Sequence, residues 1–223
     1  MRIRHRPWAM PELLESSFFE KEPKNRKGKW RECFPAEAPL YVELGCGKGG
    51  FVTEMALLHP EINFLAVDIK DDMLGIAKRK LERRFAEEGR ELGNVRLALM
   101  DIQRISEILG PEDQVDRIYI NFCNPWPRLK HKKRRLTHPR QLVQYRTFLK
   151  PDGELRFKTD DDELFEESLE YFSECGGEVR YLTRDLAQSG WQENVETEHE
   201  KMFTEMGKKI KFAVVVFGHL SKE

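Results

Sequence analysis

Short apolar runs and amphipathic stretches alternate along most of the chain. The apolar runs are rich in β-branched and aromatic side chains and predict strands, at 40–44, 63–68, 95–100, 115–122, 154–159, 179–182 and 209–217. Several intervening stretches repeat apolar side chains at helical spacing and predict helices, at 51–59, 71–86, 139–149 and 164–172. This alternation indicates an α/β fold with a seven-stranded, mostly parallel, doubly wound sheet.

The pattern also suggests how the chain is divided. Residues 1–35 precede the first predicted strand and are expected to form a basic N-terminal extension, and 36–223 a single Rossmann-like domain. Within that domain, the segment from Lys150 to Gly153 reads KPDG and is typical of a turn with proline at its second position.

Composition excludes several classes of protein. The chain is 39% hydrophobic and 35% charged, and no stretch approaches the roughly 20 apolar residues that span a bilayer. The four cysteines are far apart and form neither a C-x-x-C pair nor a zinc-ligand pattern with histidine. We therefore expect a cytoplasmic protein with free thiols, without a membrane partner and without a metal.

Charge is distributed unevenly along the chain. Residues 1–31 carry a net charge of +5 and residues 128–140, RLKHKKRRLTHPR, a net charge of +7, so the remainder carries −13. Basic segments on an otherwise acidic protein suggest a localised binding site for a polyanion. The second segment is expected to neutralise nucleic-acid phosphates.

Polar side chains follow four of the predicted strands in order: Glu43, Asp68, Asp101 and Asn124. In open α/β sheets, ligands bind beyond the carboxyl ends of the strands. These four side chains are therefore expected to line one crevice. Asp68 could accept from ribose hydroxyls, and Asp101 from an adenine amino group.

A glycine-rich loop follows the first of these strands, in the sequence ELGCGKGGF. Gly45, Gly47 and Gly50 spell G-x-G-x-x-G, which is typical of dinucleotide-binding turns. Such turns hold a pyrophosphate at a helix N-terminus, and the carboxylate of Glu43 would repel it. The same carboxylate would attract the ammonium of S-adenosylmethionine, which has no phosphate. The loop therefore favours S-adenosylmethionine over NAD.

The segment INFCNPWPRLKHKKRRLTHP resembles the Pro-Trp-Pro segment and basic tail of the bacterial tRNA (guanine-N7-)-methyltransferase family. The segments RIRHRPWA, GKW, ELGCGKGGF, FKTD and TEHEKMF are similar to the family's other motifs, in the same order. The resemblance implies a class I S-adenosylmethionine-dependent methyltransferase fold. It also implies transfer of a methyl group to N7 of the variable-loop guanine of tRNA, position 46 in tRNA numbering.

The resemblance also implies roles for particular residues. Asn124 occupies the catalytic position. Cofactor contacts are expected at Glu43, Gly45, Gly47, Asp68, Asp101 and Asn124. Substrate contacts are expected at Arg128, Asp160, Thr197, Glu198 and Glu200. The family usually has aspartate at the position of Asn124, and often lysine at that of Arg128 and tyrosine at that of His199.

Other interpretations stay open at this point. The Asn-Pro-Trp-Pro segment is similar to the N-P-P-aromatic loop of adenine N6 methyltransferases, although its aromatic residue precedes the second proline. Asparagine at position 124 would also fit a tRNA-binding module that has lost activity. Thr197 and Glu200 match the S/T-x-x-E capping box of a helix start. The oligomeric state, monomer or homodimer, is left open by the sequence.

Overall fold

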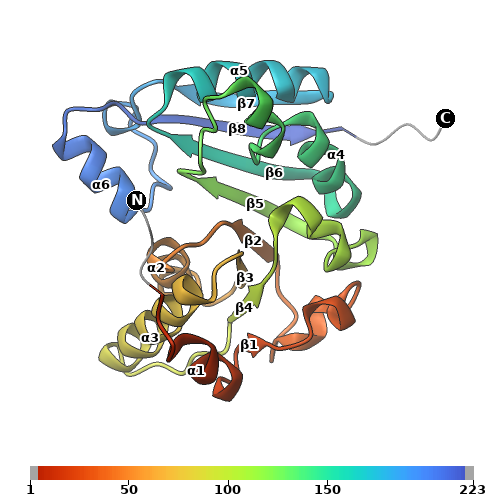
Figure 1. Ribbon diagram of the computed structural model, residues 1–223, viewed down its shortest axis with the longest axis vertical. Helices are drawn as coiled ribbons and strands as arrows, with labels where there is room; N and C mark the ends of the chain where they lie inside the picture. The colour runs from red at the N-terminus through yellow and green to blue at the C-terminus, as the bar shows by residue number, and fades with distance from the viewer. Residues whose placement is uncertain (1–4, 219–223) are drawn as a thin grey trace. The chain divides into compact units, whose positions relative to one another are not determined.

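The computed structural model describes residues 5–218, and the chain divides into two compact units, one ending at Asp113 and the other beginning at Gln114 (Figure 1). Within residues 5–218, no helix has the length and apolar character needed to cross a membrane. Arg2 and Arg4 of the basic N-terminal segment lie outside the described residues.

Four parallel strands form the sheet of the first unit, in the order β1-β4-β3-β2. They are β1 (Phe19–Glu20), β2 (Leu40–Leu44), β3 (Asn63–Asp68) and β4 (Val95–Leu99). Its helices are α1 (Ala9–Glu15), α2 (Gly50–Leu58) and α3 (Asp71–Glu87), with short 3-10 turns at Pro23–Arg26, Trp30–Cys33, Ile102–Glu107 and Pro111–Asp113. All six residues of β3 are buried, as expected for a central parallel strand.

Close approach of backbones fixes how the helices of this unit pack. Gly49 precedes α2 with φ +71°, and a Cβ on it would lie 2.6 Å from the Cβ of Ala77 in α3. Gly75 of α3 brings α1 equally close, because a Cβ there would lie 2.6 Å from the Cβ of Ala9. The guanidinium of Arg79 stacks 3.5 Å above the ring of Trp8 beside this contact.

Part of the expected N-terminal extension is therefore packed into the first unit. Trp30 is fully buried, and its indole N–H donates to the carbonyl of Ile108 at 2.7 Å. The carboxylate of Asp113 accepts from the backbone N–H groups of Gly28, Trp30 and Gly110 at 2.8–3.1 Å. Burial outweighs these hydrogen bonds and raises the pKa of Asp113.

The strands of the second unit follow the order β5-β6-β8-β7. They are β5 (Val115–Asn121), β6 (Leu149–Thr159), β7 (Gly177–Thr183) and β8 (Lys211–Phe217). β5 and β6 are parallel, and β8 runs antiparallel to both of its neighbours. The helices are α4 (Pro139–Phe148), α5 (Asp162–Glu174) and α6 (Glu198–Glu205), with 3-10 turns at Leu129–Arg134 and Leu186–Gln188.

Residues of β6 alternate between the two faces of this sheet. Phe157 packs against Phe165 and Phe172 of α5, which covers one face (Figure 1). Arg156 and Lys158 occupy the alternate positions and are only 4–5% exposed. Two buried cations on one strand require fixed anionic partners, because an unpaired buried charge is costly.

The predicted elements are largely confirmed. All seven expected strands form, and a two-residue eighth strand, β1, is added by residues too few to give a periodic signal. α1 and α6 were not predicted as helices, although the capping signal of α6 was recognised. The turn expected at Lys150–Gly153 is an excursion inside β6, since Leu149 pairs with Val115 and Glu154 pairs with Arg117.

Replacing Gly75 with alanine tests the docking of α1. Alanine favours an isolated helix by about 1 kcal/mol over glycine, but here the new methyl would overlap the Cβ of Ala9. We expect a net loss of about 1–2 kcal/mol in the free energy of unfolding, because overpacking typically costs about 1–3 kcal/mol. Adding Ala9→Gly should recover part of this loss in denaturant titrations. Stabilisation by Gly75→Ala alone would contradict the close contact.

Candidate functional site

The predicted cofactor residues of the first unit follow adjacent strands. β2, β3 and β4 are parallel neighbours, with Glu43 opposite Ala66 and Asp68 opposite Leu99. Glu43, Asp68 and Asp101 therefore lie at the same edge of this sheet, as expected. Gly45 donates its backbone N–H to the carbonyl of Val67 at 2.8 Å, which ties the glycine loop to the end of β3.

Asp68 organises the start of the glycine loop. Its side chain is 8% exposed, and its Oδ2 accepts the backbone N–H of Gly47 at 2.9 Å. Its Oδ1 accepts the N–H of Lys70 at 2.9 Å, which fixes the turn into α3. Burial raises the pKa of Asp68 despite these two hydrogen bonds. Each carboxylate oxygen has a second lone pair with which it can accept a ligand hydroxyl.

The Cys46 thiol lies near the carboxylates of both Glu43 and Asp68. Burial, and then the negative charges of Asp68 and Glu43, raise the pKa of the Cys46 thiol well above its usual value. The thiol is therefore protonated at neutral pH and is no nucleophile. Beside it, a Cβ on Gly47 would meet no atom within 4 Å, so a ligand has room to approach the backbone there. A buried acid, backbone amides and open space together suit a cationic, phosphate-free ligand.

Asp101 also caps a short helical turn. Its carboxylate accepts the N–H of Gln103 at 2.9 Å, which starts the 3-10 turn Ile102–Glu107. Capping is an ordinary structural role for aspartate, and it occupies one oxygen only. The other oxygen, Oδ2, takes no part in the cap.

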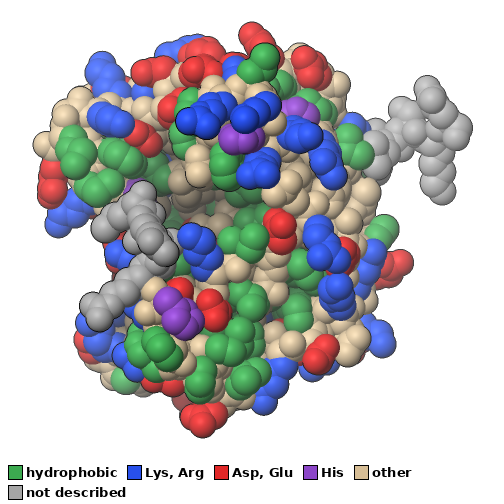
Figure 2. Space-filling model, in the orientation of Figure 1, with side chains coloured by type: hydrophobic (Ala, Val, Ile, Leu, Met, Phe, Trp, Pro, Cys, Tyr) green, Lys and Arg blue, Asp and Glu red, His purple; other side chains and the backbone are tan. Residues whose placement is uncertain are grey.

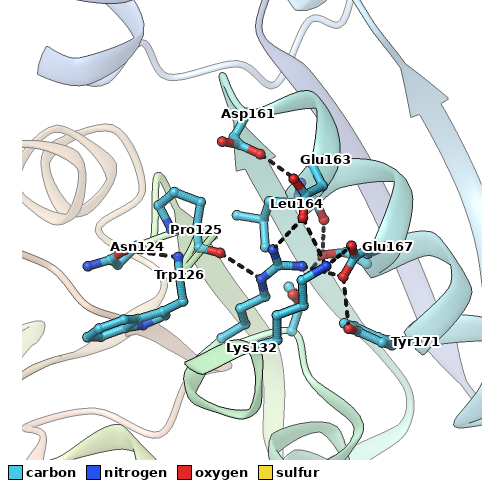
Figure 3. Close-up of polar contacts among 12 residues, drawn as sticks. Asn124, Pro125, Trp126, Lys132, Asp161, Glu163, Leu164, Glu167 and Tyr171 are labelled. Atoms are coloured by element: carbon cyan, nitrogen blue, oxygen red, sulfur yellow. Dashed lines mark hydrogen bonds and ion pairs between the residues drawn. The ribbon is translucent and has the colours of Figure 1, made fainter. Parts of the chain in front are cut away.

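Asn124, the remaining cofactor candidate, lies in the second unit on the loop that follows β5. Its Oδ1 accepts the backbone N–H of Trp126 at 3.1 Å (Figure 3). Trp126 has φ +42° and Phe122 has φ +53°, values that bulky residues rarely adopt. Such backbone conformations persist only where surrounding contacts enforce them, and they cluster at functional sites.

The basic segment after this loop has two distinct parts. Lys132 and Arg135 point towards α5, where both bind the carboxylates of Glu163 and Glu167. These two side chains are thus engaged by carboxylates of the chain itself, and the expected contact with phosphates stays a prediction for the segment. The exposed cations are Arg128, Lys130, Lys133, Arg134 and Arg140. Figure 2 shows Lys and Arg side chains gathered around a histidine on the second unit.

Asp160 comes directly after β6. This strand pairs with β5, which precedes Asn124. The carboxylate of Asp160 accepts from Lys208 at 2.6 Å, and its carbonyl accepts from Lys211 at 3.0 Å. It lines a cavity of about 460 Å³ whose walls carry both acids and cations. Asp160 therefore lies just beyond the end of β6, with its carboxylate bound to a lysine at the wall of this cavity.

Thr197 and Glu200 form the capping box that the sequence suggests. The hydroxyl of Thr197 accepts the N–H of Glu200 at 2.9 Å, and the Glu200 carboxylate accepts the N–H of Thr197 at 3.4 Å. Both side chains are buried, whereas Glu198 is exposed in the first turn of α6. Their direct role for the fold is thus to start α6 at a fixed position.

Lys158 gives this helix start a second anchor that was not predicted from the sequence. Its ammonium binds Glu200 at 3.0 Å, the carbonyl of Val195 at 3.0 Å and the side chain of Asn194 at 2.5 Å. A lysine that alternates with apolar side chains, here Leu155 and Phe157, is the signal that could have indicated a buried ion pair. His199, on the same helix, stacks on Phe122 with ring centroids 5.9 Å apart. The second unit thereby gathers α6 beside the loop of Asn124.

Within the part of the chain that the structure describes, no group of three or more His, Cys, Asp or Glu side chains is arranged to hold a metal ion. Among the acids that the sequence singled out, Asp68 accepts from backbone N–H groups, Asp160 binds Lys208 and Glu200 binds Lys158.

A family model described as "Putative methyltransferase" matches residues 37–213. A tRNA (guanine-N(7)-)-methyltransferase of Clostridium beijerinckii is 59% identical over 97% of this chain and 99% of its own length. The protein of the same name from Acetivibrio thermocellus is 53% identical over 96% of this chain and 98% of its own length.

Solved structures share the fold at low sequence identity. The 16S rRNA methyltransferase KamB matches with a TM-score of 0.59 and 11% identity, over 97% of this chain and 96% of its own. An antibiotic-related methyltransferase matches with a TM-score of 0.57 and 15% identity, over 99% and 97% of the two chains. At such identities the likeness concerns the fold alone.

The fold and the family match define a class I, S-adenosylmethionine-dependent methyltransferase. Given the extent and level of the sequence matches, the chain belongs to the tRNA (guanine-N(7)-)-methyltransferase family.

Removing the Glu200 carboxylate tests the anchor of α6. Glu200→Ala should leave the buried ammonium of Lys158 without its anionic partner and should also open the capping box. We expect the free energy of unfolding to fall by about 3 kcal/mol or more, as for other broken buried ion pairs. Glu205→Ala, in the exposed last turn of α6, is the matched control and should change it by less than about 0.5 kcal/mol in the same denaturant titration. Equal effects of the two variants would contradict the anchor.

Proposed function

We propose that this chain transfers the methyl group of S-adenosylmethionine to N7 of a guanine in tRNA, and that the guanine is the variable-loop residue at position 46. The observation that carries the proposal is 59% identity, along almost the entire length of both chains, to a protein named for this reaction. The reaction would take place in the cytoplasm, where tRNA is available to it.

The first unit supplies the residues that would hold the cofactor. The buried carboxylate of Glu43 suits its ammonium, and Asp68 suits the ribose hydroxyls. Gly45 and Gly47 allow backbone to approach the ligand, and Asp101 retains an oxygen for the adenine amino group. When bound, S-adenosylmethionine supplies an electrophilic methyl carbon on a positively charged sulfur.

For this reaction the main contribution of the protein is to orient the guanine relative to the methyl group. Guanine N7 carries a lone pair and no proton, so its methylation requires no base. The task of the chain is to hold this nitrogen in line with the bond that breaks, an effect that can contribute several kcal/mol to the barrier. We assign that task to Asn124, with Arg128, Asp160, Thr197, Glu198 and Glu200 as candidate substrate contacts.

Asn124 can act on the substrate even though one hydrogen bond is already used. The N–H of Trp126 occupies one lone pair of its Oδ1. Its Nδ2 still has two N–H donors, and guanine presents two acceptors, N7 and O6, on the same edge. Asn124 can therefore donate to O6 and leave the N7 lone pair open for reaction.

Nucleoside analysis tests the proposed reaction. The purified chain is incubated with S-adenosylmethionine and unmodified tRNA, and the tRNA is digested and examined by mass spectrometry. N7-methylguanosine, absent when position 46 is changed from guanine, is the expected result. N6-methyladenosine would identify the alternative amino-group reaction. Binding of tRNA without any methylated product would identify a module that has lost activity.

Variants of Asn124 separate geometry from charge. If Asn124 acts by positioning through its amide donors, Asn124→Asp, whose carboxylate cannot donate, and Asn124→Ala should both lower the single-turnover rate by tenfold or more, which corresponds to about 1.4 kcal/mol. The rates are measured with unmodified tRNA at saturating cofactor. An alanine variant as fast as the parent would remove Asn124 from the mechanism. A hundredfold faster aspartate variant would favour stabilisation of charge over positioning.

The exposed part of the basic segment should control the salt dependence of tRNA binding. Lys130→Ser with Lys133→Ser removes two exposed cations. If both lysines neutralise phosphates, the log–log slope of affinity against salt should fall by up to about 0.9 for each phosphate that is no longer neutralised. Lys21→Ser with Arg83→Ser removes two exposed cations of the first unit and is the matched control. An unchanged slope in the first variant would show that these lysines do not meet phosphate.

A further inference from the structure

We propose that Arg135 is the positioning residue of the Asn124 loop, and the proposal rests on the function proposed above. Arg135 belongs to the basic segment but is only 1% exposed. It therefore cannot meet a phosphate from this position. Its Nε–H instead donates to the carbonyl of Pro125, in the loop that carries Asn124.

The peptide group between Pro125 and Trp126 is held at both ends. Its carbonyl accepts a 2.6 Å hydrogen bond from the Nε–H of Arg135. Its N–H donates to Oδ1 of Asn124 at 3.1 Å. The orientation of this one peptide plane thus determines where the carboxamide of Asn124 can lie, and Arg135 fixes that orientation.

Arg135 is itself fixed by α5. Its two terminal nitrogens bind Glu167 at 2.6 Å and Glu163 at 3.3 Å. Lys132 binds the same two carboxylates, and the hydroxyl of Tyr171 donates to Glu167 at 3.1 Å. Each of the three guanidinium nitrogens therefore has a defined acceptor, in a planar fork geometry that the single nitrogen of a lysine ammonium does not reproduce.

The helix that fixes Arg135 begins beside another substrate candidate. α5 starts at Asp162, shortly after Asp160, and is capped by Asp161, whose carboxylate accepts the N–H of Leu164 at 2.7 Å. The chain from Asp160 through α5 to Arg135 and Pro125 is thus continuous in covalent and polar contacts. It sets the Asn124 loop relative to Asp160 within the second unit.

The backbone of the loop requires such a restraint. Trp126 has φ +42°, in the left-handed region that tryptophan disfavours. The hydrogen bond from Arg135 falls on the carbonyl immediately before this residue. Without it, we expect the Pro125–Trp126 peptide to relax and Asn124 to lose its defined direction.

Arg135→Lys tests the proposal, because lysine keeps the charge but replaces the three nitrogens of the planar fork with one, which does not reproduce the geometry of the bond to Pro125. We expect the single-turnover methylation rate to fall at least tenfold, with the affinity for S-adenosylmethionine, measured by calorimetry, changed less than twofold. Arg84→Lys is the matched control, since Arg84 also binds three carboxylates, those of Glu54, Glu87 and Glu88, and none of them is a candidate site residue. The control should keep the parental rate.

A double-mutant cycle separates positioning from a merely structural role. If Arg135 acts through Asn124, Arg135→Lys should slow the Asn124→Ala variant by less than twofold. Multiplying effects of the two substitutions would overturn the proposal, as would a parental rate in Arg135→Lys. A decrease in rate that follows the unfolded fraction, measured by circular dichroism at the assay temperature, would also overturn it.

Amide exchange distinguishes failure of this proposal from failure of the proposed function. In the parent, the N–H of Trp126 should exchange slowly with solvent in NMR spectra, and in Arg135→Lys it should exchange at least tenfold faster. This measurement needs no methyl transfer. If the parent makes no N7-methylguanosine but exchange of the Trp126 N–H is faster in Arg135→Lys, the proposed function is refuted and the positioning role of Arg135 is retained. If exchange is the same in both proteins, the positioning role is refuted.

Discussion

A buried guanidinium has to be surrounded by fixed acceptors, and this constraint governs the second unit. Arginine cannot lose its charge, so Arg135 draws Glu163, Glu167 and the carbonyl of Pro125 around itself. The buried ammonium of Lys158 likewise requires an anionic partner, which is Glu200 at the start of α6. The first ion pair joins the segment after β5 to α5, and the second joins the end of β6 to α6; ligands in such folds bind near these carboxyl ends of parallel strands.

In the first unit a buried charged group, Asp68, is an anion, and it likewise requires fixed hydrogen-bond partners. Asp68 is buried and keeps two backbone N–H groups as partners, and these bonds shape both the glycine loop and the entry to α3. A single carboxylate therefore serves the fold and remains available to a ligand. Burial disfavours a charged carboxylate at this edge of the sheet, and the backbone N–H donors of Gly47 and Lys70 stabilise that of Asp68.

Much of this organisation was predictable from the sequence. Apolar periodicity located the strands that carry Glu43 and Asp68 and the strand that precedes Asn124, because burial imposes the period of each element. The inward direction of Arg135 and Lys132 was not predictable, since a run of like charges has no periodicity that separates buried from exposed members. The partner of Lys158 was hidden for a different reason: Glu200 lies 42 residues further along the chain, and only the folded topology brings the two together.

The excursion inside β6 has a consequence for how the length of this chain can vary. Between two pairs of partners, β5 advances by two residues and β6 by five. The side chains after the excursion keep their faces because they are paired with β5 and β8, not because of the number of residues before them. Pro151 and Asp152 are exposed there. An insertion or deletion at this point would be absorbed by the excursion and would leave Phe157 and Lys158 on their opposite faces, so the segment is a natural position for length variation.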